Sequence, residues 1–301
     1  MSKPVAVTAS APATLRPVPL AARRRPRWLR SQRVVIGAIV LGIIVLLILL
    51  LPFVLPYAAG EQNARENFLP PFSGGSNGLH LFGTDALGRD IFARLLLGGR
   101  ISLLVAFGAG ALACVVGVTL GLIAGYEAGR LDSLIMRLVD VELAIPSILL
   151  AMGLMAAFGA SQMNVVLALA ITAWMVYART IRSAVLLLRS SQFSEAARAL
   201  GADHTRIMLR HILPNCITPI VVIATQQTAQ LIIVESSLSF LGIGVPIEIP
   251  SWGRMIAEGR SYLTTSWWII TIPGLALMMT TLALNFFGDG LRDVLDPRLR
   301  V

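Results

Sequence analysis

A polar segment at residues 189–215 has the most specific pattern of residue types in this chain. Ser194 can cap a short helix of good helix formers, and Gly201 supplies the backbone freedom that ends it. Asp203 can cap a second helix, which we expect to stop before Pro214. The result is a short, basic helix–glycine–helix element, suited to transmitting force from a soluble partner. An ordinary surface helical hairpin has the same pattern, so both interpretations stay open on geometry alone.

Two carboxylates inside an apolar run form the next candidate for chemistry. Asp140 and Glu142 lie within residues 133–158, and carboxylates inside a membrane are costly unless they face a cavity or a partner. Arg137 precedes Asp140 by three residues, so the two can form a salt bridge on one helix face. That salt bridge competes with a role in a gate or transport path. Glu142 has no evident local partner.

The apolar run at residues 216–241 carries a polar stripe. Gln227, Gln230 and, roughly two turns further on, Glu235 are predicted to share one side of a helix. Such a stripe either lines a water-filled path or packs against other helices through hydrogen bonds. Uncharged amides would suit a polar solute such as a peptide.

Common catalytic and nucleotide-binding motifs are missing from the sequence. It contains no G-x-x-x-x-G-K-[ST] loop, no H-E-x-x-H and no G-x-S-x-G. We therefore expect no ATPase site, no catalytic residues, no metal site and no cofactor in this chain. His80, His204 and His211 are expected at surface or interfacial positions.

These polar segments are embedded in a strongly apolar chain. Of the 301 residues, 56% are hydrophobic and only 14% are charged, compared with about 25% charged residues in a typical soluble domain. A membrane-spanning helix needs about 20 mostly apolar residues. The runs that qualify are residues 34–55, 101–124, 133–158, 163–188, 216–241 and 267–287. The sequence therefore predicts an all-α integral membrane protein with six transmembrane helices.

The segments around the spans differ in composition. Residues 1–33 are rich in Arg and Pro and are expected to form a disordered basic tail beside the membrane rather than a nucleic-acid-binding region. Residues 56–100 are expected to form an outer segment with an interfacial amphipathic helix over 85–97. A core domain over 101–291 holds the other five spans and a short tail, 292–301, ends the chain. Asp132 is expected to cap the third span, and Pro146 to kink it.

The distribution of positive charge predicts the orientation. Most of the 25 Lys and Arg residues fall in the N-terminal tail, around the turn after the second span, near the 189–215 segment or at the C-terminus. Because cytoplasmic loops carry the excess of Lys and Arg, both termini and the 189–215 segment are predicted to be cytoplasmic. The exceptions, predicted to lie on the other side, are Arg65, Arg89, Arg94, Arg100, Arg254 and Arg260.

The 189–215 segment also resembles a known family motif. Glu195-Ala196-Ala197, then Gly201, then Ile212-Leu213-Pro214 resemble the EAA loop of ABC importer permeases. One departure is the isoleucine, which stands at 212 instead of at the position of His211. Further matches indicate the C-type permease subunit of the dipeptide, oligopeptide and nickel group. They are FGTDALGRD at 82–90, GGRIS at 98–102, LSFLG at 238–242, PSWG at 250–253 and NFFGDGLRD at 285–293.

The resemblance covers nearly all of the chain from residue 82 onward, with residues 34–55 matching in position. It implies a type I importer fold in a bacterial inner membrane, with this chain forming half of the pore. A homologous second permease, two ATPase subunits that bind ATP and Mg²⁺, and an extracytoplasmic solute-binding protein would be its partners. The residues expected to couple to the ATPases are Glu195, Ala196, Ala197, Gly201, Ala202 and Asp203.

The same resemblance leaves the substrate open. Peptides are favoured, with nickel or other small solutes as the alternative. The candidate path residues are Asp140, Glu142, Gln227, Gln230 and Glu235. An ion-gradient-driven secondary transporter, using these carboxylates as proton sites, is the alternative from another class. Such folds often contain inverted repeats, and no convincing repeat is evident in this sequence.

Overall fold

The computed structural model describes residues 32–53, 60–76 and 78–295 of the chain. Within these residues, five helices are long and apolar enough to cross a membrane, and a bent pair of shorter helices makes up to six spans. The prediction of an all-α membrane protein is confirmed, apart from one short hairpin. Residues 1–31 of the predicted N-terminal tail lie outside the described residues, as does the chain end at 296–301.

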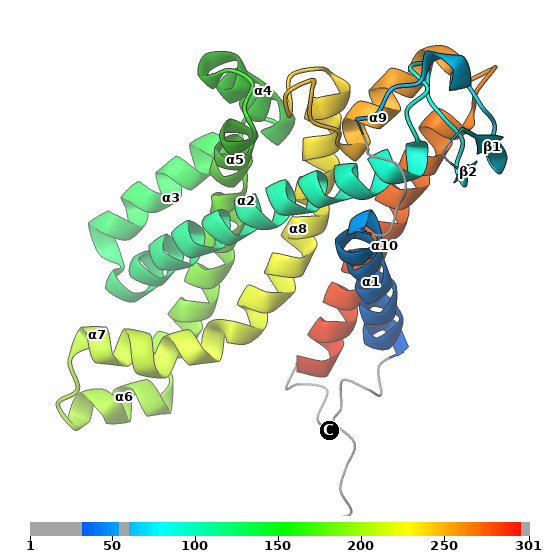
Figure 1. Cartoon of the computed structure of the whole chain (residues 1–301). Coiled ribbons are helices and arrows are strands. Elements are labelled where there is room, and N and C mark those ends of the chain that lie inside the picture. Colours follow the sequence, from blue (N-terminus) through cyan, green and yellow to red (C-terminus); the bar gives the residue numbers. More distant parts are fainter. Residues whose placement is uncertain (1–31, 54–59, 77, 296–301) are drawn as a thin grey trace, which may run out of the picture.

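Helices α1 (Gln32–Leu50) and α10 (Trp268–Leu295) pack against each other at one side of the molecule (Figure 1). Glycines set the distance between them. A Cβ atom on Gly37 would lie 2.7 Å from the backbone nitrogen of Phe287, and one on Gly290 would lie 2.7 Å from that of Val34. Because a side chain at either position would separate the helices, this pairing depends on small residues. A one-turn 3-10 helix, Leu51–Phe53, follows α1.

Helix α2 is a single helix of 37 residues, Ile91–Glu127. The prediction of a separate interfacial helix over 85–97 is therefore wrong. Residues 85–90 form a turn, and Asp90 caps α2 by accepting the backbone N–H of Ala93 at 2.7 Å. Nothing in residues 97–101 breaks the helix, because two adjacent glycines weaken a helix without removing a hydrogen bond.

Helix α2 packs along α5 (Gln162–Arg189) through three glycines at four-residue spacing. Cβ atoms on Gly117, Gly121 and Gly125 would lie 2.3, 2.5 and 2.8 Å from atoms of α5. Spacing of four places these glycines on one helix face. The G-x-x-x-G pair at 117 and 121 is thus a site of close helix approach, as small residues allow in membranes.

The third span is broken. Helix α3 (Gly129–Leu143) and helix α4 (Ser147–Phe158) meet at an angle of 91°. Pro146 stands at the break, where its missing N–H and its restriction of the preceding residue prevent continuous helix. The predicted kink at Pro146 is confirmed and is larger than expected. The predicted cap at Asp132 is wrong, because α3 begins earlier and Asp132 lies in its first turn.

A second long helical path follows α5. Helix α6 (Gln192–Ala199) leads to α7 (His204–Ile207), a π-helical turn (Met208–Ile212), a 3-10 turn (Leu213–Cys216) and α8 (Ile217–Phe240). The prediction that the second helix stops before Pro214 is wrong. The π and 3-10 turns absorb the proline, and the Asn215 side chain donates to the carbonyl of His211 at 2.7 Å. Residues 204–240 therefore form one continuous rod.

Short elements gather at one end of the bundle (Figure 1). Strands β1 (Ser73–Gly75) and β2 (Gly78–His80) form an antiparallel hairpin, and α9 (Trp252–Gly259) lies in the loop between α8 and α10. Neither was predicted from the sequence. We call this the hairpin end. The opposite end, which holds α6 and α7 and the described ends of α1 and α10, is the α6 end.

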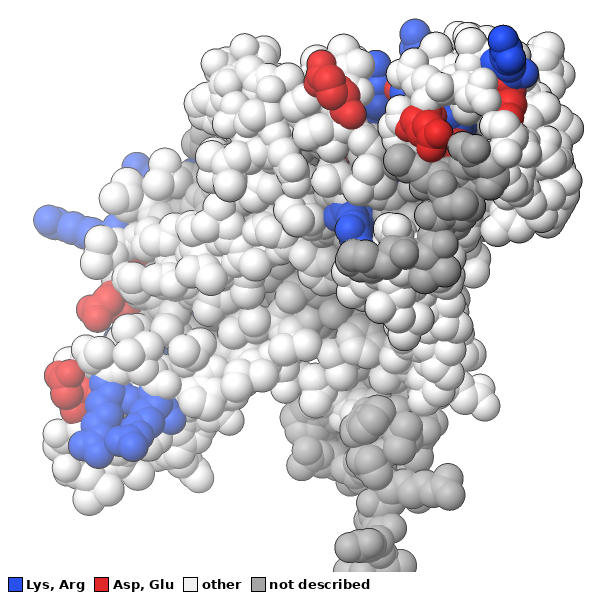
Figure 2. Space-filling view, viewed as in Figure 1, with Lys and Arg blue, Asp and Glu red and all other residues white. Residues whose placement is uncertain are grey.

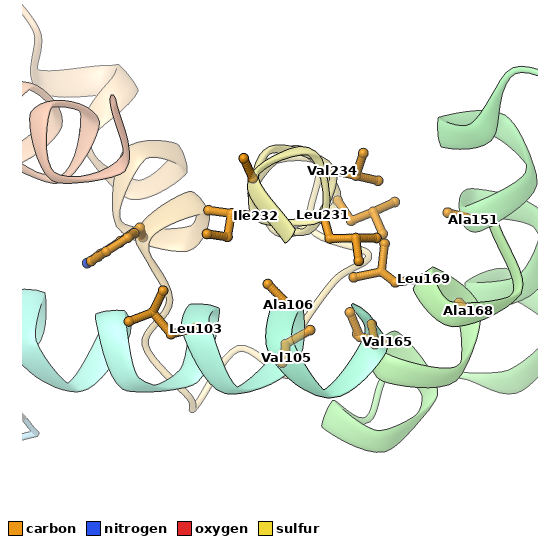
Figure 3. Close-up of a cluster of buried hydrophobic side chains, with 14 of the residues drawn as sticks. Leu103, Val105, Ala106, Ala151, Val165, Ala168, Leu169, Leu231, Ile232 and Val234 are labelled. Carbon is orange, nitrogen blue, oxygen red and sulfur yellow. The ribbon is translucent and has the colours of Figure 1, made fainter. Parts of the chain in front are cut away.

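The hydrophobic core lies where α2, α4, α5 and α8 meet. Figure 3 shows Leu103 of α2 near Ile232 of α8 at one side of this cluster, and Leu231 of α8 near Val165 and Leu169 of α5 at the other. Small side chains dominate the α2 and α5 surfaces, which keeps these two helices close while larger side chains of α8 fill the remaining space.

Candidate translocation path and coupling surface

A cavity of about 270 Å³ lies between the break in the third span and helix α8. Leu143, Pro146 and Ser147 line it on the side of the break, and Thr172 lines it from α5. Irregular backbone at membrane depth is tolerated where it lines a cavity. The break and the cavity are therefore parts of one feature.

Gln227 and Gln230 of α8 line this cavity. Neither amide has a hydrogen-bond partner among the described residues, so their donors and acceptors are available to a solute or to water. No Lys, Arg, Asp or Glu is among the cavity-lining residues. The structure thus brings the two predicted amides together in a neutral polar site.

Glu235 does not share their environment. Its side chain is 0% exposed and accepts a hydrogen bond from the Ser239 hydroxyl at 2.8 Å. The predicted stripe of Gln227, Gln230 and Glu235 is therefore wrong at its third member. Positions 230 and 235 differ by five residues, which turns Glu235 away from the amides on a helix of 3.6 residues per turn.

The carboxylates of α3 pair with α5. Asp140 forms an exposed ion pair with Arg179 of α5, so the predicted pairing with Arg137 is wrong. Glu142 accepts a hydrogen bond from the indole nitrogen of Trp174 at 2.8 Å, and its other oxygen is buried without a partner among the described groups. Neither carboxylate lines the cavity beside Gln227. The cross-helix partners lie 39 and 32 residues away in sequence, which local spacing cannot reveal.

At the α6 end, Gly201 closes helix α6 with a Schellman motif. The N–H of Gly201 donates to the carbonyl of Arg198 at 2.9 Å, and the N–H of Ala202 donates to that of Ala197 at 3.0 Å. Gly201 has a φ of +80° and open space around it. The predicted helix–glycine–helix turn is confirmed, and the left-handed backbone explains why glycine stands there.

The capping residues differ in part from the prediction. Ser191, not Ser194, stands at the N-terminal cap of α6. Ser194 is buried in the first turn, where its hydroxyl donates to the carbonyl of Leu188 at 2.7 Å. Asp203 stands at the cap position of α7 as predicted, although its side chain makes no capping hydrogen bond.

The residues of the α6 turn divide into an inner and an outer set. Ala197 is buried against the cluster that holds Ile207 and Ile212, whereas Glu195 and Ala196 are exposed. Leu200, at the tip of the turn, is 89% exposed. Sequence reasoning missed Leu200, although an apolar residue directly before the helix-ending glycine was a visible signal.

Basic side chains surround this tip. Figure 2 shows blue side chains gathered over α6 and α7, where Arg198, Arg206 and Arg210 are exposed. The Tyr126 hydroxyl lies 3.1 Å from His204 Nδ1 and ties α7 to the end of α2. The α6 end therefore presents a basic, partly apolar surface on a firm base.

The hairpin end is held by charged groups instead. Asp85 accepts hydrogen bonds from Arg89 and Arg94, both at 2.6 Å, and Arg94 also contacts Glu258 of α9 at 2.8 Å. The predicted surface position of His80 is wrong, since its side chain is 2% exposed and lies 2.7 Å from Asp90. His204 and His211 are exposed and half-buried, in line with the prediction.

Glu66 joins the hairpin to the segment before it. Its carboxylate accepts the backbone N–H of Ser76 at 2.5 Å and lies 3.1 Å from His80 Nε2. The hydrogen bond from the Ser76 backbone, followed by those from the Ser76 and His80 side chains, lowers the pKa of Glu66 below its ordinary value.

The fold defines the class of protein. An inward-facing structure of the MetNI methionine ABC transporter matches with a TM-score of 0.57 at 20% sequence identity, covering 67% of this chain and 96% of that chain. At this identity the match concerns the fold alone. The chain thus has the type I ABC importer permease fold, which confirms the prediction.

Sequence comparisons show the family. The family described as "Binding-protein-dependent transport system inner membrane component" matches residues 117–301, and "N-terminal TM domain of oligopeptide transport permease C" matches residues 22–71. A putative peptide transport system permease protein of Brucella suis is 42% identical over 95% of this chain and 93% of its own length. The di/tripeptide transport system permease protein of Pseudomonas aeruginosa is 40% identical, with 88% of each chain covered. A glutathione transport system permease protein of Pectobacterium atrosepticum is 39% identical over 91% of this chain and 90% of its own.

The chain therefore belongs to the family of inner membrane permease components of binding-protein-dependent transport systems. It is a multi-pass membrane protein and a permease subunit.

Proposed function

We propose that this chain forms half of the translocation pore of an ATP-driven importer that takes up peptides. A homologous second permease supplies the other half, and two ATPase subunits bind ATP and Mg²⁺. An extracytoplasmic binding protein delivers the peptide to the hairpin end. The observation that carries this proposal is the α6 turn, a basic tip with an 89% exposed leucine on a rigid base, in a chain of this permease family.

The α6 turn supports docking to an ATPase. Glu195, Ala196, Leu200 and Gly201 are all exposed at the tip, and the small size of Ala196 and Gly201 allows a partner surface to approach closely. Leu200 is the apolar side chain of an otherwise polar and basic turn, and its burial against a partner surface would stabilise docking. Ala197, Ala202 and Asp203 shape the turn from behind.

Orientation follows from this docking. In this proposal the ATPases bind in the cytoplasm, so the α6 end is cytoplasmic, as are the described ends of α1 and α10 that lie at the same end of the molecule. Both chain termini are then cytoplasmic, in agreement with the excess of Lys and Arg on that side. The hairpin end is extracytoplasmic.

The neutral cavity supports a peptide substrate. Gln227 and Gln230 offer amide donors and acceptors, which match the backbone groups shared by all peptides. The absence of charged lining residues suits peptides of varied side-chain charge. The relatives named for peptide, di/tripeptide and glutathione transport support the same substrate class. Asp140 and Glu142 lie outside this cavity and retain only a weaker role, in positioning α3.

The experiment is uptake of a labelled dipeptide by the complex purified from its native membrane and reconstituted in liposomes with its binding protein. We expect ATP-dependent uptake and co-purification of two ATPase subunits. Leu200→Asp should reduce uptake at least tenfold, because a charge at the docking tip opposes burial in the partner. The matched control is Leu79→Asp on β2, an exposed residue of the hairpin end, which should leave co-purification of the two ATPase subunits unchanged, whereas Leu200→Asp should reduce it.

Each result decides between the candidate classes. Uptake by this chain alone, driven by a proton gradient without ATP, would overturn the importer proposal in favour of a secondary transporter. Uptake of nickel or another small solute, with none of any peptide, would retain the importer and overturn the substrate class. An equal loss of ATPase co-purification in Leu200→Asp and Leu79→Asp would contradict the docking role of Leu200.

A further inference from the structure

Glu235 is a fully buried carboxyl group without a cationic partner. It lies near the hairpin end of α8, is 0% exposed, and takes part in no ion pair with a described residue. A buried carboxyl group is costly unless hydrogen bonds compensate it. The path formed by Gln227 and Gln230 does not use it, so another role must account for its place.

Serine hydroxyls supply the compensation. The Ser239 hydroxyl donates to Glu235 Oε1 at 2.8 Å, and its oxygen accepts the backbone N–H of Val245 at 3.3 Å. The Ser102 hydroxyl of α2 lies close to the Glu235 carboxyl group, and its oxygen accepts the backbone N–H of Trp252 at 3.3 Å. Both serines thus stand between Glu235 and the loop that follows α8.

Ser251 makes the third link of this kind. Its hydroxyl lies close to the Glu235 carboxyl group, and the same oxygen caps α9 by accepting the backbone N–H of Arg254 at 3.3 Å. A serine hydroxyl has a single proton. Because each of these oxygens already accepts an N–H group, each hydroxyl proton is free to point at Glu235. The three serines are at most 1% exposed, so water does not compete.

The backbone of the loop lies directly on α8. A Cβ atom on Gly253 would lie 2.2 Å from the carbonyl oxygen of Ser236, and one on Gly244 would lie 2.4 Å from the hydroxyl of Ser239. Any displacement of this loop relative to α8 therefore disturbs the hydrogen bonds to Glu235. Residues 245–254 and α8 form one mechanical unit.

That unit reaches both functional regions. Arg254 and Glu258 of α9 line a surface cleft of about 400 Å³ at the hairpin end, together with Arg89. In the other direction, α8 carries the amides of the cavity and is joined through the 3-10 and π-helical turns to residue 204 beside the α6 turn. A movement at the cleft can thus be transmitted through Glu235 to the rod.

We propose that Glu235 is a positioning residue that locks residues 245–259 to α8, so that docking of the binding protein on the extracytoplasmic surface is transmitted to the ATPases. The proposal rests on the importer function. The attachment of residues 245–259 to α8 through Glu235, which we call the lock, does not depend on that function. It can be measured on the isolated complex without a transport assay.

The first experiment is hydrogen exchange on the purified complex carrying Glu235→Ala. We expect at least tenfold faster exchange of backbone amides in residues 245–259, with no change in the hairpin at residues 73–80. Glu235→Gln should show a smaller increase, because its oxygen still accepts while its NH₂ group faces a hydroxyl donor. Unchanged exchange at 245–259 in Glu235→Ala would overturn the lock, whether or not the complex transports peptides.

The second experiment is ATP hydrolysis with and without loaded binding protein. We expect Glu235→Ala to keep basal hydrolysis within twofold of the native rate and to lose stimulation by the binding protein at least tenfold, with partial rescue in Glu235→Gln. Full stimulation in Glu235→Ala, despite faster exchange, would overturn transmission. No stimulation in the native complex would instead contradict the proposed function, and the exchange result would still decide the lock.

Controls and smaller changes keep the test decisive. Ser237→Ala and Ser183→Ala each remove a serine hydroxyl that bonds only to a carbonyl of its own helix, that of Ile233 and that of Arg179. Both should behave as the native complex. If Glu235→Ala fails to assemble, Ser239→Ala and Ser102→Ala each remove one link. Native exchange and stimulation in both would overturn the proposal, and loss in either would support it.

Discussion

The two ends of this molecule are stabilised in different ways. At the hairpin end, Asp85, Arg94 and Glu258 form a half-buried ion network that joins segments more than 160 residues apart. At the α6 end, α6 and α7 are joined to the bundle by apolar contacts and a few hydrogen bonds, while Leu200 stays exposed. Figure 2 shows mixed charges at the hairpin end and mainly basic side chains at the other.

The hairpin end therefore satisfies its charged groups within the chain, whereas the α6 end leaves an apolar side chain exposed for a partner. Buried ion pairs need every member in place, because removing one strands a charge. A rigid turn with an exposed apolar tip, in contrast, stays folded when no partner is bound to it. The hairpin end is therefore sensitive to substitutions that unfold it, and the α6 end to substitutions that leave it folded but disconnect it.

The largest expected effect is loss of the ion network. Asp85→Ala should lower the free energy of unfolding by about 3–5 kcal/mol, because it leaves Arg94 buried with only Glu258 as partner. Thermal unfolding in detergent measures this loss. The control Asp140→Ala removes an exposed pair at the other side of the bundle and should cost about 0–1 kcal/mol. Equal effects would remove the distinction between the two ends.

Gly201→Pro should disconnect the α6 end without unfolding the protein. Proline cannot adopt a φ of +80° and cannot donate to the Arg198 carbonyl, so the turn must be re-aimed. We expect uptake to fall at least tenfold while ATP hydrolysis continues, as measured in reconstituted complexes. Gly159→Pro is the matched control, since Gly159 has a φ of +81° and caps α4. Unchanged coupling in Gly201→Pro would contradict docking at this turn.

Tyr126→Phe tests how firmly the α6 turn is seated. It removes the hydroxyl that contacts His204 and should reduce the free energy that holds α7 against the end of α2 by about 0.5–1.5 kcal/mol. Hydrogen exchange should become roughly two- to tenfold faster in residues 192–207 only. Tyr262→Phe, at the hairpin end, removes a hydroxyl without a hydrogen-bond partner among the described residues and should change nothing.

The smallest expected effect is a pH dependence of the hairpin. The pKa of Glu66 is lowered in the folded state, so its hydrogen bonds stabilise the hairpin fully above its ordinary value of 4.5. This contribution falls as the pH drops below that value and through the lowered pKa. Hydrogen exchange of residues 73–80 between pH 5 and pH 3 should show the loss, and Glu66→Gln should flatten it. The α6 turn should show no matching change.

The fold was largely predictable because apolar runs and proline positions act locally. All six runs became helical, and Pro146 broke the third. Helix boundaries were less predictable. Helix α2 begins at Ile91, and no residue before Gly98 and Gly99 indicates that the helix continues through these two glycines. Helix α9 was missed because it is only 8 residues long and its loop contains two prolines.

The candidate site was predictable only where its geometry is local. The Gly201 turn depends on neighbouring residues and was predicted from them. The partners of Asp140 and Glu142 come from another helix, so spacing along one helix paired Asp140 wrongly and offered no partner for Glu142. Glu235 is buried and turned away from the two amides. His80 was misplaced for the same reason, because its carboxylate partners become neighbours only after the hairpin folds.

The π and 3-10 turns at residues 208–216 give the long helix a point of unequal stiffness. Here the regular ladder of backbone hydrogen bonds changes its spacing twice within nine residues, around Pro214. A helix with such a defect bends there before it bends elsewhere. The stiff part from residue 217 onward can therefore tilt as a lever while the α6 turn keeps its orientation on a partner.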